Sequence, residues 1–292
     1  MTNFTRTVFG LTLLAISAGV VIAACTGGSD PVTCNDPRVD ISNVPEVQDG
    51  VLSIGSELGF EPMNFINAET STPDGFEIEF ARALANELCV DVRFVRTSFD
   101  GLLGSLNAGG FDVIIASMTI TDERKVRADF IPYIKVGSAI LVRSGNPHGV
   151  EELEDLCGLT IAVQSGTVQL EMLQDQGRSC GKPIDILEFG THEQTMIDLT
   201  VAGSEASMTD FPVAFLAAKD SDGRLQLIEG QFEQEDYGIG VRKSSAQLQE
   251  ALTQARDNLI CSGEYDNILE AWNLEASHRF DEDGSDHPDC PS

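Results

Sequence analysis

Side chains that could hold a small zwitterion follow four short apolar segments of the chain. They are Glu57 and Phe60 after VLSIGS, Ser117, Thr119 and Arg124 after FDVII, Gln164, Thr167 and Val168 after TIAV, and Asp210 after ASM. An arginine fork, hydroxyl donors and the free N–H groups at the start of a helix all donate to carboxylate oxygens. A buried aspartate accepts hydrogen bonds from an ammonium group. The four turns together therefore predict a clamp for a molecule that carries both charges.

Strand-like segments alternate with helix-like ones along the chain, which predicts an α/β fold with two lobes. The first set has strands at 51–56, 91–95 and 111–115 and helices at 75–88 and 100–107, the second of which has Asp100 as its expected N-cap. The second set begins with a strand at 159–163 and a helix at 168–176, and it continues to about residue 219. A further strand at YGIGVRKS and helices at 246–259 and 265–272 follow. Because ligands bind outside the carboxyl ends of strands in such sheets, the four turns should converge if the lobes face each other.

Each candidate residue also has a plain structural interpretation. Thr121 could simply start a helix whose Arg124 pairs with Asp129 on the surface. Asp210 could cap the helix that begins at Phe-Pro, and Phe60 and Phe99 could be ordinary core residues. Periodicity alone favours these interpretations, which leave the convergence of the four turns unexplained.

The N-terminal residues 1–24 predict a signal peptide. Arg6 is followed by an apolar, acid-free run from Val8 to Ala24, which is typical of a cleaved leader rather than of a membrane-spanning helix. The tetrapeptide IAAC resembles a bacterial lipobox, which implies cleavage before Cys25 and a lipid on its sulfur. An ordinary secretory signal with a chance cysteine is the alternative. Residues 25–48 are polar and are expected to form a tether.

The composition indicates a globular, strongly acidic protein. The chain has 292 residues, of which 42% are hydrophobic, with 47 Asp plus Glu against 18 Lys plus Arg, for a formal charge of −29. This charge repels phosphate backbones and argues against nucleic acid as a partner.

Six cysteines remain once Cys25 is set aside, and an even number in an exported chain indicates disulfides. Membership of the two lobes predicts the pairs Cys157 with Cys180 and Cys261 with Cys290, which leaves Cys34 and Cys89, although the sequence does not fix the connectivity. Metal binding is the rival hypothesis, but no CxxC occurs and the four histidines are scattered. His192-Glu193 begins like HExxH yet has Met196 where the second histidine belongs. No metal or other cofactor is expected.

Residues from about 50 to 274 resemble the extracellular solute-binding proteins of family 3, the substrate-binding lipoproteins of polar-amino-acid ABC transporters. The matching segments are GFEIEFARALANEL, FDGLLGSLNAGGFDVIIASMTITDERKVRADFIPY, LEDLCGLTIAVQSGT, TDFPVAFL, YGIGVRKS and SGEYDNILEAW. TITDER after a buried strand is the most specific of these motifs. QSGT and TDFPVA support it at the expected spacing.

The resemblance implies a two-lobed periplasmic-binding-protein-like type II fold. The expected divisions are lobe 1 at 49–134 and 239–275, lobe 2 at 139–234, hinge crossings near 135–138 and 235–238, and an acidic tail at 276–292. It also implies a monomer that lies outside the cytoplasm, is anchored by lipid, and serves a membrane permease. A bound amino acid would bridge the lobes and shift the population toward a closed form.

The resemblance also implies roles for single residues. Arg124, Thr119 and the Val168 amide would hold the α-carboxylate, and Asp210, helped by Ser117 and Thr119, would hold the α-ammonium. Phe60 and Phe99 would sandwich the ligand side chain. Val168 stands where many relatives carry a second hydroxyl residue, so only its N–H can serve here.

Glu57 predicts the class of ligand, because an unpaired carboxylate in the pocket would repel glutamate and aspartate. A basic amino acid such as arginine or lysine is therefore expected, with glutamine or another polar neutral amino acid as the alternative. Gln164 can donate or accept, so it is expected to decide little. An enzyme of the cyclohexadienyl or arogenate dehydratase kind, which shares this fold, is the alternative class. No GxSxG, P-loop or GxGxxG motif occurs, and a binding protein rather than an enzyme is expected.

Overall fold

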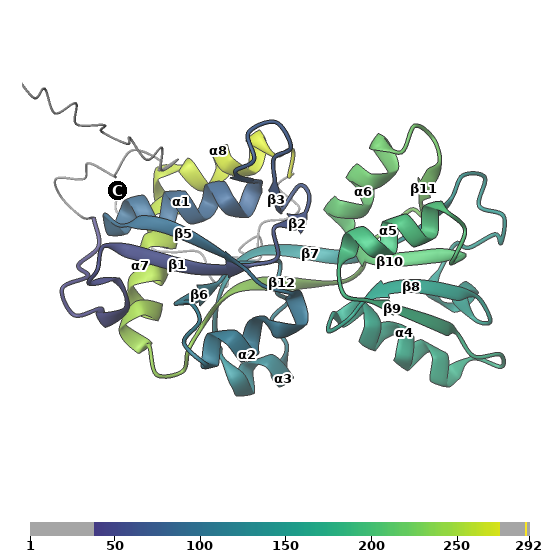
Figure 1. Ribbon diagram of the computed structural model, residues 1–292, viewed down its shortest axis with the longest axis horizontal. Helices are drawn as coiled ribbons and strands as arrows, with labels where there is room; N and C mark the ends of the chain where they lie inside the picture. Colours follow the sequence, from purple (N-terminus) through teal and green to yellow (C-terminus); the bar gives the residue numbers. More distant parts are fainter. Residues whose placement is uncertain (1–37, 275–289, 291–292) are drawn as a thin grey trace, which may run out of the picture. The chain divides into compact units, whose positions relative to one another are not determined.

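The computed structural model describes residues 38–274 and Cys290 (Figure 1). The predicted signal peptide at 1–24, the lipidation site Cys25 and Cys34 lie outside the described part of the chain. So do residue 275 and, in the predicted acidic tail, residues 276–289 and 291–292. Within the described residues, no helix has the length and apolar character needed to cross a membrane.

The first group of elements, here called lobe 1, is built on a short parallel sheet. The sheet holds β5 (Asp91–Arg96), β1 (Val51–Ser56) and β6 (Val113–Ile114) in that order, and a small antiparallel sheet holds β2 (Gly59–Phe60), β3 (Asn64–Ile66) and β4 (Pro73–Asp74). Its helices are α1 (Phe76–Leu88), α2 (Leu102–Asn107), α3 (Asp122–Arg127), α7 (Ala246–Ser262) and α8 (Glu264–Ala271), with 3-10 turns η1 (Pro45–Val47) and η2 (Phe99–Gly101). The small antiparallel sheet was not expected from the sequence, because its strands are too short to show periodicity.

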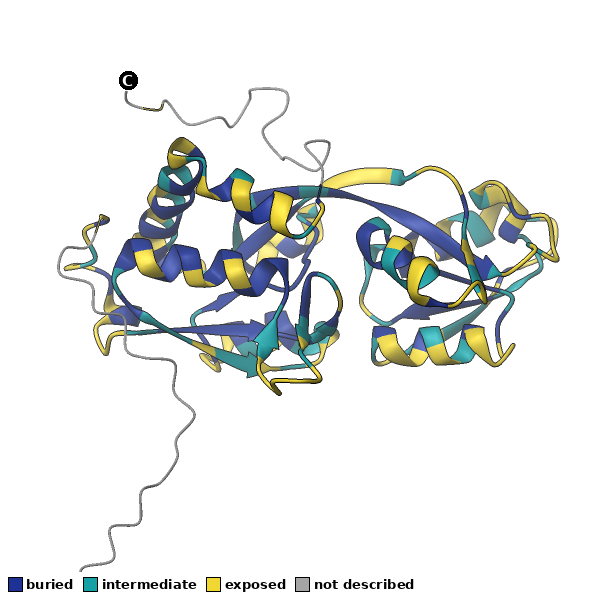
Figure 2. Cartoon of the chain, turned by 90° about the horizontal axis from the view of Figure 1, so that it is seen from above, coloured by how far each residue is buried: buried dark blue, intermediate teal, exposed yellow. Residues whose placement is uncertain are grey.

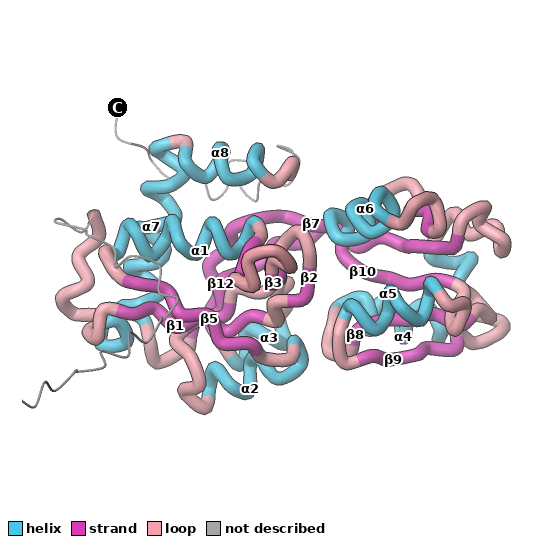
Figure 3. The backbone as a smooth tube through the Cα atoms, turned by 45° about the horizontal axis from the view of Figure 1, so that its top comes forward, coloured by secondary structure: helices cyan, strands magenta, loops and turns pink. Residues whose placement is uncertain are grey.

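The second group, here called lobe 2, repeats the plan. Its strands are β8 (Thr160–Gln164), β9 (Asp185–Phe189), β10 (Ala206–Asp210) and β11 (Leu225–Leu227), and its helices are η3 (Leu153–Leu156), α4 (Val168–Ser179), α5 (His192–Thr200) and α6 (Phe211–Asp220). Strand β8 runs parallel to both β9 and β10. Figure 3 shows the helices α4, α5 and α6 beside these strands.

Two long strands connect the lobes. Strand β7 (Asp129–Arg143) pairs with β12 (Phe232–Val241) and continues into lobe 2, where it pairs with β10. The predicted hinge crossings near 135–138 and 235–238 therefore lie in one antiparallel ribbon, in which Asp236 is opposite Lys135 (Figure 1). The predicted α/β fold with two lobes and two crossings is confirmed.

Helix α1 shows how the sequence fixes one of these elements. Phe76, Phe80, Leu84 and Leu88 recur every four residues, so they lie on one stripe of the helix, and all four are fully buried in the core of lobe 1. Burying one such side chain stabilises the fold by about 1.5 to 3 kcal/mol. Figure 2 shows that buried and exposed residues alternate along the helices, with the buried ones facing the sheets and the exposed ones facing outward.

Two expected elements differ from the observed ones. Strand β6 covers only Val113–Ile114 of the expected run 111–115, although Asp112 and Ile115 still donate to carbonyls of β1. Asp100 is not an N-cap, because a 3-10 turn begins at Phe99 and precedes α2. The helix therefore starts later than its polar residue suggests.

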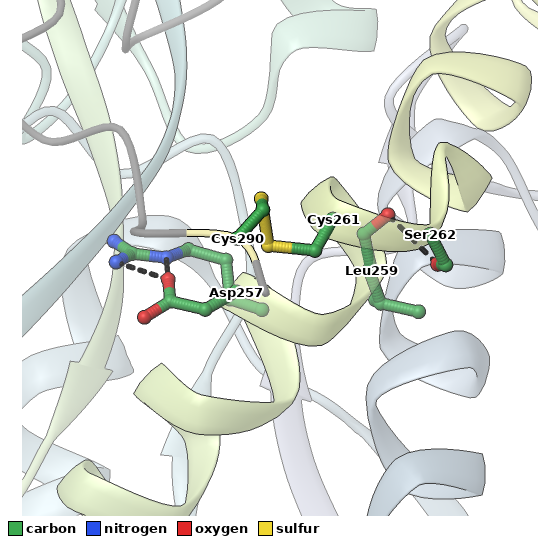
Figure 4. Close-up of a disulfide and its surroundings, with 6 residues drawn as sticks. Asp257, Leu259, Cys261, Ser262 and Cys290 are labelled. Atoms are coloured by element: carbon green, nitrogen blue, oxygen red, sulfur yellow. Dashed lines mark hydrogen bonds and ion pairs between the residues drawn. A yellow bond between two sulfur atoms is a disulfide. The ribbon is translucent and has the colours of Figure 1, made fainter. Parts of the chain in front are cut away.

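The structure contains the disulfides Cys157–Cys180 and Cys261–Cys290. Figure 4 shows the second of them, Cys261–Cys290. Cys89 is also disulfide-bonded, and its expected partner Cys34 lies outside the described residues. Cys261 is in the last turn of α7, so its bond fixes Cys290 beside that helix.

Candidate functional site

One pocket between the lobes brings together every residue that the sequence predicted to contact a ligand. It is lined by Glu57, Phe60, Asn64, Phe99, Ala116, Ser117, Thr119, Arg124, Gln164, Thr167, Val168, Gln169, His192, Met208, Thr209 and Asp210. The four turns named from the sequence therefore converge. Whether these residues contact a ligand remains a prediction.

Arg124 reaches the pocket from α3 and is held by main-chain carbonyls. Thr121 caps this helix with its side chain, which accepts from the Arg124 N–H at 3.2 Å. The guanidinium donates from Nη1 to the Thr119 carbonyl at 2.8 Å and from Nη2 to the Gly166 carbonyl at 2.9 Å. Its Cζ lies 5.5 Å from the centre of the Phe99 ring. Arg124 is 8% exposed, so the surface pair with Asp129 is ruled out, and Asp129 pairs with Lys243 instead.

The turn at Gly166 lets lobe 2 approach the arginine. Gly166 has φ +76°, and a Cβ added there would lie 3.1 Å from the Cβ of Asp100 in lobe 1. Thr167 caps α4 and accepts from the Leu170 N–H, while its hydroxyl donates to the Gln164 carbonyl. Val168, the first residue of α4, lines the pocket.

Asp210 ends strand β10 on the opposite side of the pocket. Its Oδ1 accepts from Gln169 Nε2 at 2.6 Å, and Gln169 also donates to the Ser138 hydroxyl of β7 at 2.9 Å. The Asp210 side chain makes no capping hydrogen bond to α6, so the simple capping interpretation fails. Burial raises the pKa of Asp210 to about 6, against the lowering effects of Tyr237 and Gln169.

Glu57 lines the pocket from lobe 1 and meets lobe 2 through the amide of Gln164. Gln164 Nε2 donates to both Glu57 oxygens, at 3.0 and 2.9 Å. Burial raises the pKa of Glu57, and Gln164 partly opposes this effect. The same end holds Phe60, whose ring meets the His192 ring edge-on with centroids 5.1 Å apart.

His192 was not predicted to line the pocket. It begins α5, and its Nδ1 lies 3.3 Å from the Thr209 hydroxyl. Burial lowers the pKa of His192 to about 4, so the ring is neutral at pH 7. The turn after β9, which could have revealed it, was not counted among the converging turns. In the described parts of the chain, no group of three or more His, Cys, Asp or Glu residues could hold a metal ion.

Behind the pocket, the buried Glu77 of α1 orients Ser117. Its Oε1 accepts from the Ser117 N–H at 2.6 Å, from the Ser117 hydroxyl at 2.9 Å and from the Tyr133 hydroxyl, and its Oε2 accepts from Asn64 at 2.6 Å. Ser117 has φ +51°, a strained value for a residue with a side chain. Because the Ser117 hydroxyl donates its hydrogen bond to Glu77, the lone pairs of the Ser117 oxygen remain free to accept from a donor in the pocket.

Comparison with known proteins identifies relatives over most of the described chain. The family model described as bacterial extracellular solute-binding proteins, family 3, matches residues 52–275. The L-cystine-binding protein of Escherichia coli K12 is 30% identical over 224 residues, which are 76% of this chain and 82% of that protein. The arginine-binding protein of Corynebacterium glutamicum is 29% identical over 248 residues, which are 82% and 81% of the two chains.

A solved structure shares the fold. An ancestral arginine-binding protein bound to glutamine aligns with a TM-score of 0.73 at 34% identity, and the alignment covers 77% of this chain and 99% of that one. The family and fold class predicted from the sequence are confirmed by these matches.

Proposed function

The chain belongs to the bacterial extracellular solute-binding proteins of family 3, and on this premise we propose that it captures a free amino acid for an ABC importer, with basic amino acids preferred. The observation that carries the proposal is a pair of buried, opposite charges from different lobes in one pocket. Arg124 and Asp210 are each 8% exposed. Neither belongs to an ion pair found among the described residues.

A buried charge without a counter-charge is costly. The α-carboxylate of an amino acid supplies an anion for Arg124, and the α-ammonium supplies a cation for Asp210. Thr119 and the Val168 N–H donate to the carboxylate, as the N-terminus of a helix favours an anion. Ser117 accepts from the ammonium through the oxygen that Glu77 has oriented.

The charge balance of the pocket supports a basic ligand. Arg124 contributes one positive charge, while Glu57 and Asp210 contribute two negative ones, so the three residues sum to −1. A zwitterion without a charged side chain leaves this sum unchanged, whereas arginine or lysine brings it to zero. Phe60 and Phe99 line the same pocket and would flank the ligand side chain.

Glutamine is the second candidate, because Gln164 already partners Glu57 without a ligand cation. The names of the relatives include binders of arginine and of cystine, and one solved relative holds glutamine. These names concern those proteins, and they agree with a pocket built for an α-amino acid. They are binding proteins, which supports transport rather than dehydratase chemistry.

The anchor and partner complete the proposal. Cleavage before Cys25 and lipidation of its thiol would hold the protein outside the cytoplasmic membrane through the tether at 25–48. The lobe boundaries inferred from the sequence, 49–134 with 239–275 and 139–234, would then move as two bodies about the β7–β12 ribbon. A monomer in the closed form would meet the membrane permease.

A thermal-shift panel of the free amino acids tests this proposal. A ligand at about 1,000 times its dissociation constant adds about 4 kcal/mol to stability, so arginine and lysine should raise the melting temperature most and glutamine less. Aspartate and glutamate should have the smallest effect. If no amino acid raises it, or if the acidic ones raise it most, the proposal is wrong.

A further inference from the structure

The contact between Gln164 and Glu57 joins the two lobes in the wall of the pocket. Glu57 is 5% exposed and Gln164 is 6% exposed. One nitrogen, Nε2, donates to both carboxylate oxygens at 3.0 and 2.9 Å. The amide is fixed by its place at the end of β8, one residue after the buried Val163.

In the described part of the chain, no Lys or Arg side chain forms an ion pair with the Glu57 carboxylate. The nearest candidate, Arg96, directs its Nε to the Glu57 main-chain carbonyl at 3.2 Å. Glu57 takes part in none of the ion pairs found there. The carboxylate is therefore hydrogen-bonded by uncharged groups, the Gln164 amide and the His192 main-chain N–H, while Arg96 acts on its charge without forming an ion pair with it.

We propose that Gln164 sets the charge class of the amino acid that the pocket accepts. The inference rests on the proposed function and makes its substrate class more specific. The amide satisfies the Glu57 oxygens when the ligand side chain is neutral, so glutamine is tolerated. It adds no charge, so a ligand guanidinium or ammonium still finds a carboxylate with no cation in direct contact, and basic amino acids are preferred.

Substitutions at this position should shift preference in opposite directions. Gln164→Lys would place a permanent cation on Glu57, which removes the advantage of a basic ligand and adds repulsion against it. Gln164→Leu would remove the amide donor and leave the buried carboxylate with the His192 main-chain N–H, so that a ligand cation gains more from satisfying it. The first change favours glutamine over arginine, and the second favours arginine over glutamine.

Isothermal titration calorimetry with L-arginine and L-glutamine tests the inference. The measured quantity is the ratio of the two dissociation constants in the wild-type protein, Gln164→Lys, Gln164→Leu and the control Gln194→Lys. Gln194 is exposed on α5 of the same lobe, so its substitution adds the same charge away from the pocket. Circular dichroism of each variant confirms that it is folded.

The expected result is a shift of about 30-fold or more toward glutamine in Gln164→Lys, since a buried charge pair is gained or lost. Gln164→Leu should shift the ratio about tenfold toward arginine, and Gln194→Lys should leave it unchanged. An unchanged ratio in both Gln164 variants, with the wild type still binding amino acids, overturns this inference alone. A wild type that binds no amino acid overturns the proposed function as well.

Discussion

Asp210 is a carboxylate whose pKa is raised by its buried surroundings. It lies at the end of β10, with Gln169 as its hydrogen-bond donor, and burial raises its pKa to about 6. An ammonium group placed beside it would favour the ionised form and lower this pKa. Ligand binding is therefore linked to release of a proton whenever the free protein is partly protonated at Asp210.

This linkage predicts that affinity for amino acids falls in acid. Below a pKa of about 6 the free Asp210 is protonated, so affinity should drop by up to tenfold for each further pH unit, and it should level off above about pH 7. Calorimetry with L-glutamine across this range measures the effect. Glu57, whose pKa is also raised, adds a pH dependence of its own to the affinity. The variant Asp210→Asn keeps only that contribution, so its pH profile is the reference for the wild type. Identical pH profiles for the two proteins would contradict the assignment.

The free protein should show the opposite trend in stability. Because the pKa of Asp210 is higher when folded, about 6, than its ordinary value of 3.8, the folded state binds this proton more strongly. The contribution of Asp210 to the free energy of unfolding therefore rises as the pH falls from about 6 toward 4. Low pH weakens ligand binding at this residue while it relieves the cost of the buried charge.

The elements that carry the site meet at Glu77, near the start of α1. Its carboxylate joins α1 to β3 through Asn64, to the turn after β6 through Ser117, and to β7 through Tyr133. It is fully buried, and burial raises its pKa against these hydrogen bonds. One side chain thus fixes the position of the proposed ammonium subsite relative to a strand that enters the hinge ribbon.

Glu77→Ala should therefore destabilise the protein and weaken ligand binding together. It leaves buried donors on Asn64, Ser117 and Tyr133 without an acceptor, which should lower the free energy of unfolding by about 2 to 4 kcal/mol. Urea denaturation measures this change. Glu79→Ala, on the exposed face of the same helix, loses the hydrogen bond from Trp272 and should cost less than about 1 kcal/mol. Equal costs would show that the Glu77 network contributes little.

The sequence predicted the turns at the ends of the strands better than it predicted the side chains behind them. Glu57 follows β1 directly, Asp210 ends β10, and Arg124 lies in the short helix after β6, so their places near the strand ends were readable from strand periodicity. Gln169 lies second in α4, and whether it faces Asp210 or solvent depends on where that helix starts. Glu77 lies on an amphipathic helix, where an acid normally indicates the solvent face, and only tertiary contacts reveal that it is buried.

The contact that bears on the class of ligand could not be predicted from the sequence for the same reason. Gln164 was expected to decide little, because the chain order does not reveal that Glu57 of the other lobe lies against it. The contact spans 107 positions of the chain. The resemblance placed both residues in the pocket, but their pairing required the structure.

At the scale of the whole described chain, the lobes meet at the pocket and beside it. Arg124 donates to the Gly166 carbonyl, Gln164 donates to Glu57, and Phe60 packs against His192. Val213 of α6 also packs into the core of lobe 1, and the β7–β12 ribbon runs from one lobe to the other. A ligand held by Arg124 from one lobe and by Asp210 from the other would strengthen this closed arrangement, because only the closed form offers both charges at once.

Calorimetric titration with L-arginine and with agmatine, which is arginine without its α-carboxylate, tests this bridging most directly. Agmatine should bind the wild-type protein at least about 30-fold more weakly, since the buried pair with Arg124 is lost. In Arg124→Ala, L-arginine should weaken to a similar degree while agmatine is little affected, and Arg127→Ala on the exposed face of α3 should change neither. Equal affinity of the wild type for both ligands, or equal weakening of both by Arg124→Ala, would contradict the account.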